Sequence, residues 1–114
     1  MTRDELLSII EKSNQSIETE LKSGISGWRR FVVISTDFGY SIRADENGCA
    51  IVGFIGVEDT ATRLTKREAY RAATTFKARN GHGEIAWNVL GVADYLIRLK
   101  AKNDSLIEFM TLYK

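Results

Sequence analysis

Apolar residues recur with a helical period over residues 2–23. The stripe that they form consists of Leu6, Ile10, Ile17 and Leu21. Charged side chains fall largely outside this stripe, as in an amphipathic helix. Thr2 and Glu5 have the spacing of a capping box, and Ser23-Gly24 is a typical helix end. The pattern predicts one amphipathic helix over residues 2–23.

The pattern then changes to short β-branched segments. Residues 28–36 read WRRFVVIST, which is typical of a strand, and Asp37-Phe38-Gly39 predicts a turn after it. Asn47-Gly48 is the residue pair preferred by type I′ hairpin turns. Such a turn pairs Glu46 with Cys49, Ala44 with Ile51 and Ile42 with Gly53. One predicted face then holds Tyr40, Ile42, Ala44, Ile51 and Ile55, and the other holds Ser41, Arg43 and Asp45.

A second helix is predicted from Thr65, which has Glu68 in the capping-box position, to a stop at Asn80-Gly81. Its narrow apolar stripe consists of Ala69, Ala72, Ala73 and Phe76. Because these side chains are small, we expect the helix to lie close against the sheet.

Residues 84–102 are rich in Val, Ile and Leu, which occur in both helices and strands. At 100° per residue most apolar positions gather on one half of a helical wheel, and this favours a third helix. The alternative is a hairpin of strands 94–102 and 105–113, joined at Asn103-Asp104. Under either interpretation, residues 105–113 are predicted to be a strand.

These elements predict an α+β domain of order α-β-β-β-α-α-β, with about four antiparallel strands and two or three helices on one face. The alternative order is α-β-β-β-α-β-β. A chain of 114 residues without a Pro/Gly/Ser-rich linker is expected to form a single domain over residues 1–114. The longest uncharged run has eleven residues, 47–57, which is too short to span a membrane, and no signal peptide is evident. We therefore expect a cytoplasmic protein that does not enter membranes.

Motifs that would carry catalysis or bind metals are missing from this sequence. His82 and Glu84 form an H-x-E, but the zinc deaminase chemistry of that motif also needs two Cys ligands, and Cys49 is the single Cys. No phosphate-binding Gly loop or nucleophile motif occurs. We expect no enzyme activity, no cofactor and no metal site, and the roles of His82 and Cys49 stay open.

Basic residues concentrate between positions 63 and 79. Six of them occur there with a single acid, Glu68, although the whole chain carries a net charge of only +1. Five candidates for phosphate contacts are expected to project outward: Arg63, Lys66, Arg67, Arg71 and Lys77. The charge distribution is therefore polarised, and it leaves a nucleic-acid-binding face open.

The segment from Thr65 to Ala73 (TKREAYRAA) resembles the start of the last helix in double-stranded RNA-binding domains, and the order α-β-β-β-α is shared with them. The resemblance implies a nucleic-acid-binding function for this helix. The segment departs from the family at Tyr70, where the family has a lysine. The chain also lacks the family's Gly-Pro-x-His loop, and further elements follow the helix.

Large aromatic and arginine side chains suggest a different function. The candidates for a protein interface are Trp28, Arg29, Arg30, Trp87 and Tyr95. Trp, Tyr and Arg are the residues that most often anchor protein–protein contacts. The leading hypothesis is a small non-enzymatic protein that binds a partner protein or a second copy of itself, of the kind found among phage and mobile-element accessory factors. The alternative is a nucleic-acid-binding domain that uses the basic helix.

Overall fold

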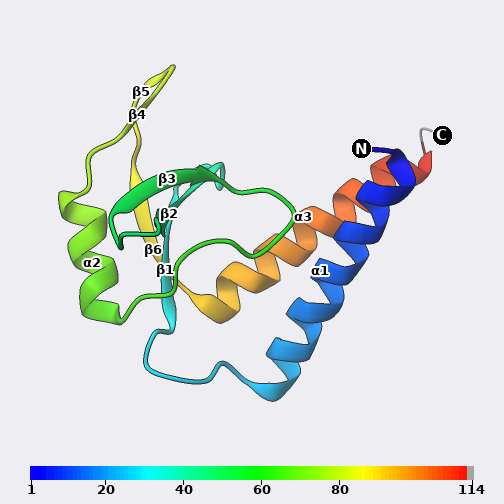
Figure 1. Ribbon diagram of the computed structural model, residues 1–114, viewed down its shortest axis with the longest axis horizontal. Coiled ribbons are helices and arrows are strands. Elements are labelled where there is room, and N and C mark those ends of the chain that lie inside the picture. Colours follow the sequence, from blue (N-terminus) through cyan, green and yellow to red (C-terminus); the bar gives the residue numbers. More distant parts are fainter. Residues whose placement is uncertain (113–114) are drawn as a thin grey trace.

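The computed structural model describes residues 1–112 and contains a four-stranded antiparallel sheet with three helices (Figure 1). The sheet has the order β3-β2-β1-β6, with β1 (Phe31–Ser35), β2 (Tyr40–Ala44), β3 (Ala50–Phe54) and β6 (Trp87–Gly91). The helices are α1 (Arg3–Ser23), α2 (Lys66–Thr75) and α3 (Val92–Leu112), and β4 (Arg79–Asn80) and β5 (Gly83–Glu84) form a small separate hairpin. The predicted α+β class is confirmed.

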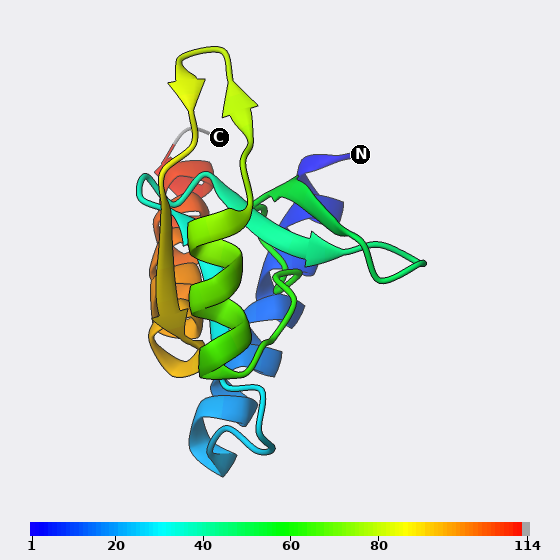
Figure 2. The same ribbon diagram turned by 90° about the vertical axis from the view of Figure 1, so that its left-hand side faces the viewer.

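Strand β1 is covered by helices on both faces. Val32 and Ile34 pack into a cluster with residues of α1 and α3, whereas Val33 packs against Ala69 of α2. Figures 1 and 2 show α2 on one side of β1 and the α1–α3 pair on the other. The prediction that all helices share one face is therefore wrong. A strand that is apolar at successive positions, as β1 is, needs cover on both faces.

A buried polar cluster joins α1, α3 and the segment that follows β3. Asn103 of α3 has no exposed surface, and its Nδ2 donates hydrogen bonds to Asn14 Oδ1 at 3.1 Å and to the Val57 carbonyl at 2.8 Å. Asn14 Nδ2 donates in turn to Asp104 Oδ1 at 3.0 Å. Because buried polar groups are costly without partners, these bonds favour one particular alignment of the two helices.

The two predicted helix starts are confirmed. Thr2 accepts a hydrogen bond from the Glu5 amide, and Thr65 with Glu68 forms a complete capping box. The predicted end of the second helix is wrong, because α2 stops at Thr75 rather than at position 80. Phe76 takes an extended conformation and packs against Trp87, so the chain leaves the helix and forms the β4–β5 hairpin.

The β2–β3 register differs from the prediction by one residue. Ile42 pairs with Val52 and Ala44 with Ala50. Gly48 has φ +78° but Asn47 does not have a positive φ, so the turn is not type I′, which needs both. Asp45 explains the longer loop, because its Oδ1 accepts from the amides of Asn47 and Cys49 at 2.8 and 2.9 Å.

The shifted register changes the two faces of the hairpin. Val52 now shares a face with Ile42, and Ile51 lies across from Arg43, where it is 43% exposed. Ile55 also leaves the predicted face and joins the α1–α3 side of the core.

The predicted third helix is correct for residues 92–102 but begins too early, and the hairpin alternative is wrong. Residues 87–91 form β6, which pairs with β1 at Val33↔Val89, and α3 begins directly afterwards at Val92. The predicted strand over 105–113 is helical as far as Leu112, and Tyr113 lies outside the described residues. Apolar residues at 89, 90, 92 and 93 fit a helical wheel and a buried strand equally well, so pairing with β1 decides between them.

Asn103→Ala removes both hydrogen bonds of the buried amide and leaves the Asn14 acceptor without a donor. We expect the free energy of unfolding to fall by about 1–3 kcal/mol, measured by urea denaturation. Gln15→Ala, an exposed amide on α1, is the control and should change it by less than about 0.5 kcal/mol. Equal stability of Asn103→Ala and the wild-type protein would show that the cluster does not stabilise the fold.

Candidate interaction surface

A two-residue bridge places residues 28–30 beside the start of α2. The Phe31 amide donates to the Leu64 carbonyl at 3.0 Å, and the Leu64 amide donates to the Phe31 carbonyl at 2.7 Å. Arg29 Nε lies 3.7 Å from Glu68 Oε1 in the first turn of the helix. The bridge therefore joins part of the predicted protein interface to part of the predicted phosphate-binding face.

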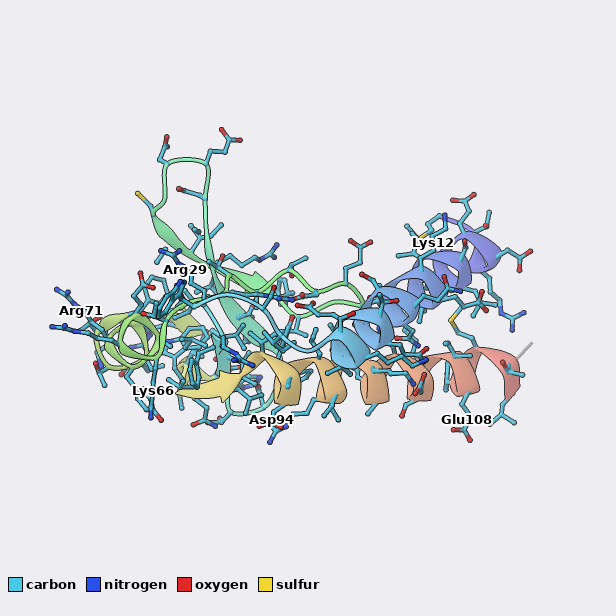
Figure 3. All side chains as sticks on the ribbon, turned by 90° about the horizontal axis from the view of Figure 1, so that it is seen from below. Lys12, Arg29, Lys66, Arg71, Asp94 and Glu108 are labelled. Atoms are coloured by element: carbon cyan, nitrogen blue, oxygen red, sulfur yellow. The ribbon has the colours of Figure 1, made fainter. Side chains whose placement is uncertain are left out.

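We call the combined surface the α2 patch, and it consists of Trp28, Arg29, Arg30, Lys66, Arg67, Tyr70 and Arg71. The Trp28 side chain is 90% exposed and that of Tyr70 is 53% exposed. The residues from α2 lie on its outer side, because Ala69 on the inner side has no exposed surface. Figure 3 shows Arg29, Lys66 and Arg71 around α2 at one end of the molecule, with Lys12 and Glu108 at the other.

The carboxylate of Glu68, the acidic residue within the α2 patch, is engaged in the capping box of α2. Its carboxylate accepts a hydrogen bond from the Thr65 amide at 3.0 Å, and this bond, with Thr65 Oγ1 and the nearby Arg29, lowers the pKa of Glu68. Within residues 1–112, Lys66, Arg67 and Arg71 form no ion pair. Three cations of the patch are thus available to a ligand.

Two of the residues predicted to contact phosphate form ion pairs within the chain instead. Arg63 forms hydrogen bonds to both carboxylate oxygens of Glu20 on α1 and to Asp59 Oδ2 at 2.9 Å. These contacts lower the pKa of Glu20 and raise that of Arg63, so the expectation that Arg63 projects freely outward is wrong. Lys77 is exposed, but its Nζ lies 3.5 Å from Glu84 Oε1 on β5. Arg63 therefore fastens α1 to the segment that leads into α2.

Two of the predicted interface aromatics belong to the core. Tyr95 on α3 is 1% exposed and its ring lies 6.0 Å from that of Phe38. Trp87 is half-buried, and its ring lies 6.1 Å from Phe76 beneath α2. The protein-interface candidates that stay on the surface are Trp28, Arg29 and Arg30.

His82 and Cys49 lie apart from the α2 patch. His82 is exposed in the β4–β5 turn, where its amide donates to Asn80 Oδ1 at 2.7 Å. Cys49 is exposed beside the β2–β3 turn. In the part of the chain that the structure describes, no group of three or more His, Cys, Asp or Glu side chains is placed to hold a metal ion.

Tyr70 is the member of the α2 patch that the sequence interpretation missed. It follows Lys66 by four positions and Arg67 by three, so helical spacing alone places it beside both cations. The signal was therefore present in the sequence, in the face that the capping box and the alanine stripe define.

Comparisons with known proteins found no relative. No family model matches the chain, and no curated protein or solved structure matches it significantly. The resemblance to double-stranded RNA-binding domains thus stays limited to nine residues and the order of elements. Among residues 1–112, no helix is both long and apolar enough to span a membrane.

The buried Tyr95 is expected to titrate abnormally. Burial, with a smaller contribution from the Asp59 carboxylate, raises the pKa of the Tyr95 phenol from 10.0 to about 12. Because the folded-state pKa is raised, the stabilising contribution of neutral Tyr95 is complete below pH 10 and is lost as the pH rises towards 12. The phenolate absorbance of wild type minus Tyr95→Phe should therefore have its midpoint near 12. A midpoint near 10 would show that the phenol is not buried.

Proposed function

We propose that this chain is a small non-enzymatic binding protein whose α2 patch docks onto an acidic surface of a partner protein. The observation that carries the proposal is the 90% exposure of Trp28, which directly precedes Arg29 at the first turn of α2, where Lys66 and Arg67 have no counter-ion in residues 1–112. When a partner covers an exposed Trp side chain, a large apolar surface is removed from water, and this favours binding.

The chemistry of the patch supports a carboxylate-bearing partner. Arg29, Arg30, Arg67 and Arg71 present planar guanidinium groups, which bind carboxylates through two parallel hydrogen bonds. Trp28 and Tyr70 supply rigid apolar area between these charges, and interface hot spots are enriched in Trp, Tyr and Arg.

The net charge of the residues outside the α2 patch favours a compact acidic protein over a long polyanion as the partner. Five of the sixteen Lys and Arg residues lie in the patch together with Glu68, so the rest of the chain carries eleven basic against fourteen acidic residues. Such a body repels an extended anion once it leaves the patch, over distances comparable to a Debye length of about 8 Å. An acidic protein surface of matching size avoids this repulsion.

A photo-crosslinking residue at position 28 tests the proposal in a lysate of the source cells. We expect a specific protein adduct that survives nuclease treatment and that the double variant Arg67→Glu/Arg71→Glu reduces at least about tenfold. The matched control is the same crosslinker at Lys12, at the opposite end of the molecule, which should not yield this adduct. Absence of any adduct specific to position 28 would overturn the proposal.

The same patch carries a second candidate function, the binding of nucleic acid. The observation that favours it is the position of Lys66 and Arg67 in the first turn of α2, where the free amides and the helix dipole also attract phosphate. Trp28 and Tyr70 are exposed rings on which bases can stack.

A salt titration of binding to duplex RNA, duplex DNA and single strands tests this candidate. Lys66→Ala/Arg67→Ala should weaken binding and lower the slope of log K against log salt by about one per lost phosphate contact. Lys12→Ala/Lys22→Ala removes the same charge from α1 and should leave the slope unchanged. Without measurable binding at low salt, the nucleic-acid function is excluded.

A further inference from the structure

Strand β6 forms an edge of the sheet, and half of its backbone groups point away from β1. The Thr36 amide bonds to the Ala86 carbonyl and the Val92 amide bonds to the Arg30 carbonyl. Because hydrogen-bonded rungs alternate in an antiparallel pair, residues 86, 88, 90 and 92 bond towards β1. The amide and carbonyl groups of Trp87 and Val89 and the amide of Gly91 therefore face the open side, whereas the Gly91 carbonyl accepts the first hydrogen bond of α3.

This edge lacks the features that keep other sheet edges unpaired. Residues 87–91 read WNVLG, without a charge, a Pro or a bulge that would discourage another strand. The other edge strand, β3, belongs to a hairpin whose strand pairing with β1 consists of the single residue pair Ile34↔Ser41. Figure 2 shows that hairpin projecting to one side, and β6 at the opposite border beside α2. Edge β6 thus continues the well-packed part of the sheet.

We propose that two copies of this chain associate through their β6 edges into one continuous eight-stranded sheet. A two-fold axis at Val89 places Val89 opposite itself and Trp87 opposite Gly91 of the second copy. Val89 then exchanges two hydrogen bonds with Val89 of the second copy, and the Gly91 amide of each copy donates to the Trp87 carbonyl of the other, about four bonds in total. A two-fold axis also uses the same edge on both copies, so neither copy keeps an open β6 edge.

The side chains along this edge are self-complementary. A Cβ added at Gly91 would meet no atom closer than Asp94 Oδ2 at 4.0 Å, so there is free space above this residue. Next to it is a mainly apolar hollow of about 390 Å³ lined by Ile25, Arg30, Phe31, Gly91, Val92 and Ala93. The half-buried Trp87 of the second copy lies opposite this space, and an aromatic ring over a strand glycine is a favourable cross-strand pair.

Substitution of Gly91 tests the dimer without disturbing the monomer. Gly91 does not have a positive φ and its surroundings are open, so Gly91→Lys is compatible with the fold. It places a charged side chain where Trp87 of the second copy lies. The matched control is Gly56→Lys, because a Cβ at Gly56 also meets nothing within 4 Å and Gly56 lies outside β6.

Light scattering coupled to size exclusion should show twice the chain mass of 12.8 kDa for the wild type and for Gly56→Lys. Gly91→Lys should dissociate at least about tenfold more readily, with unchanged circular dichroism. In the wild type, hydrogen exchange of the Val89 amide should slow as the protein concentration rises, which supplies a readout that needs no variant. A wild-type monomer at every concentration, or a Gly91→Lys dimer of unchanged affinity, would overturn the proposal.

The proposed dimer and the proposed function can be tested independently of each other. Arg67→Glu/Arg71→Glu changes the α2 patch and should leave the β6 dimer intact. Gly91→Lys changes the β6 edge and should retain the crosslink from position 28. If the charge-reversal variant instead becomes monomeric with unchanged circular dichroism, the interface runs through α2 and the β6 assignment is wrong.

Discussion

Burial of β1 on both faces is the constraint on which the rest of this structure depends. Val32 and Ile34 require one helical layer and Val33 requires another, so α2 cannot share a face with α1 and α3. The backbone hydrogen bonds of β1 also go to two different neighbours. Phe31 bonds to Leu64 on one side, while the alternate residues bond to β6 on the other. One five-residue strand thereby determines on which side of the sheet α2 lies and where the sheet ends.

Both proposed binding surfaces follow from that arrangement. Since Phe31 is hydrogen-bonded to Leu64, Arg29 lies beside the first turn of α2 and next to Glu68, and the exposed Trp28 directly precedes it. Since β6 is the last strand on its side of β1, the outward amide and carbonyl groups of Trp87 and Val89 have no hydrogen-bond partner within residues 1–112. The α2 patch suits an acidic ligand, whereas the β6 edge suits another β-strand.

Much of the helical structure was predictable because its signals are local. Thr2 and the Thr65–Glu68 capping box mark helix starts wherever the rest of the chain lies. The β2–β3 register was not predictable from Asn47-Gly48, because the Asp45 carboxylate stabilises a longer loop by bonding two amides. Of the candidate site, Lys66, Arg67 and Arg71 were identified correctly as exposed helix residues, but Arg63 pairs with a helix more than forty positions earlier in the chain.

The sequence by itself determined the α+β class, the starts of α1 and α2, the inner stripe of α2 and the uneven distribution of charge. These features depend on residues within a few positions of one another, where spacing and capping chemistry act directly. Only the tertiary structure decided that residues 87–91 form a strand, that Tyr95 is core and that Arg29 lies beside α2. Each of these depends on β1, which offers hydrogen bonds and apolar surface to segments far away in sequence, and such long-range pairing overrides local periodicity.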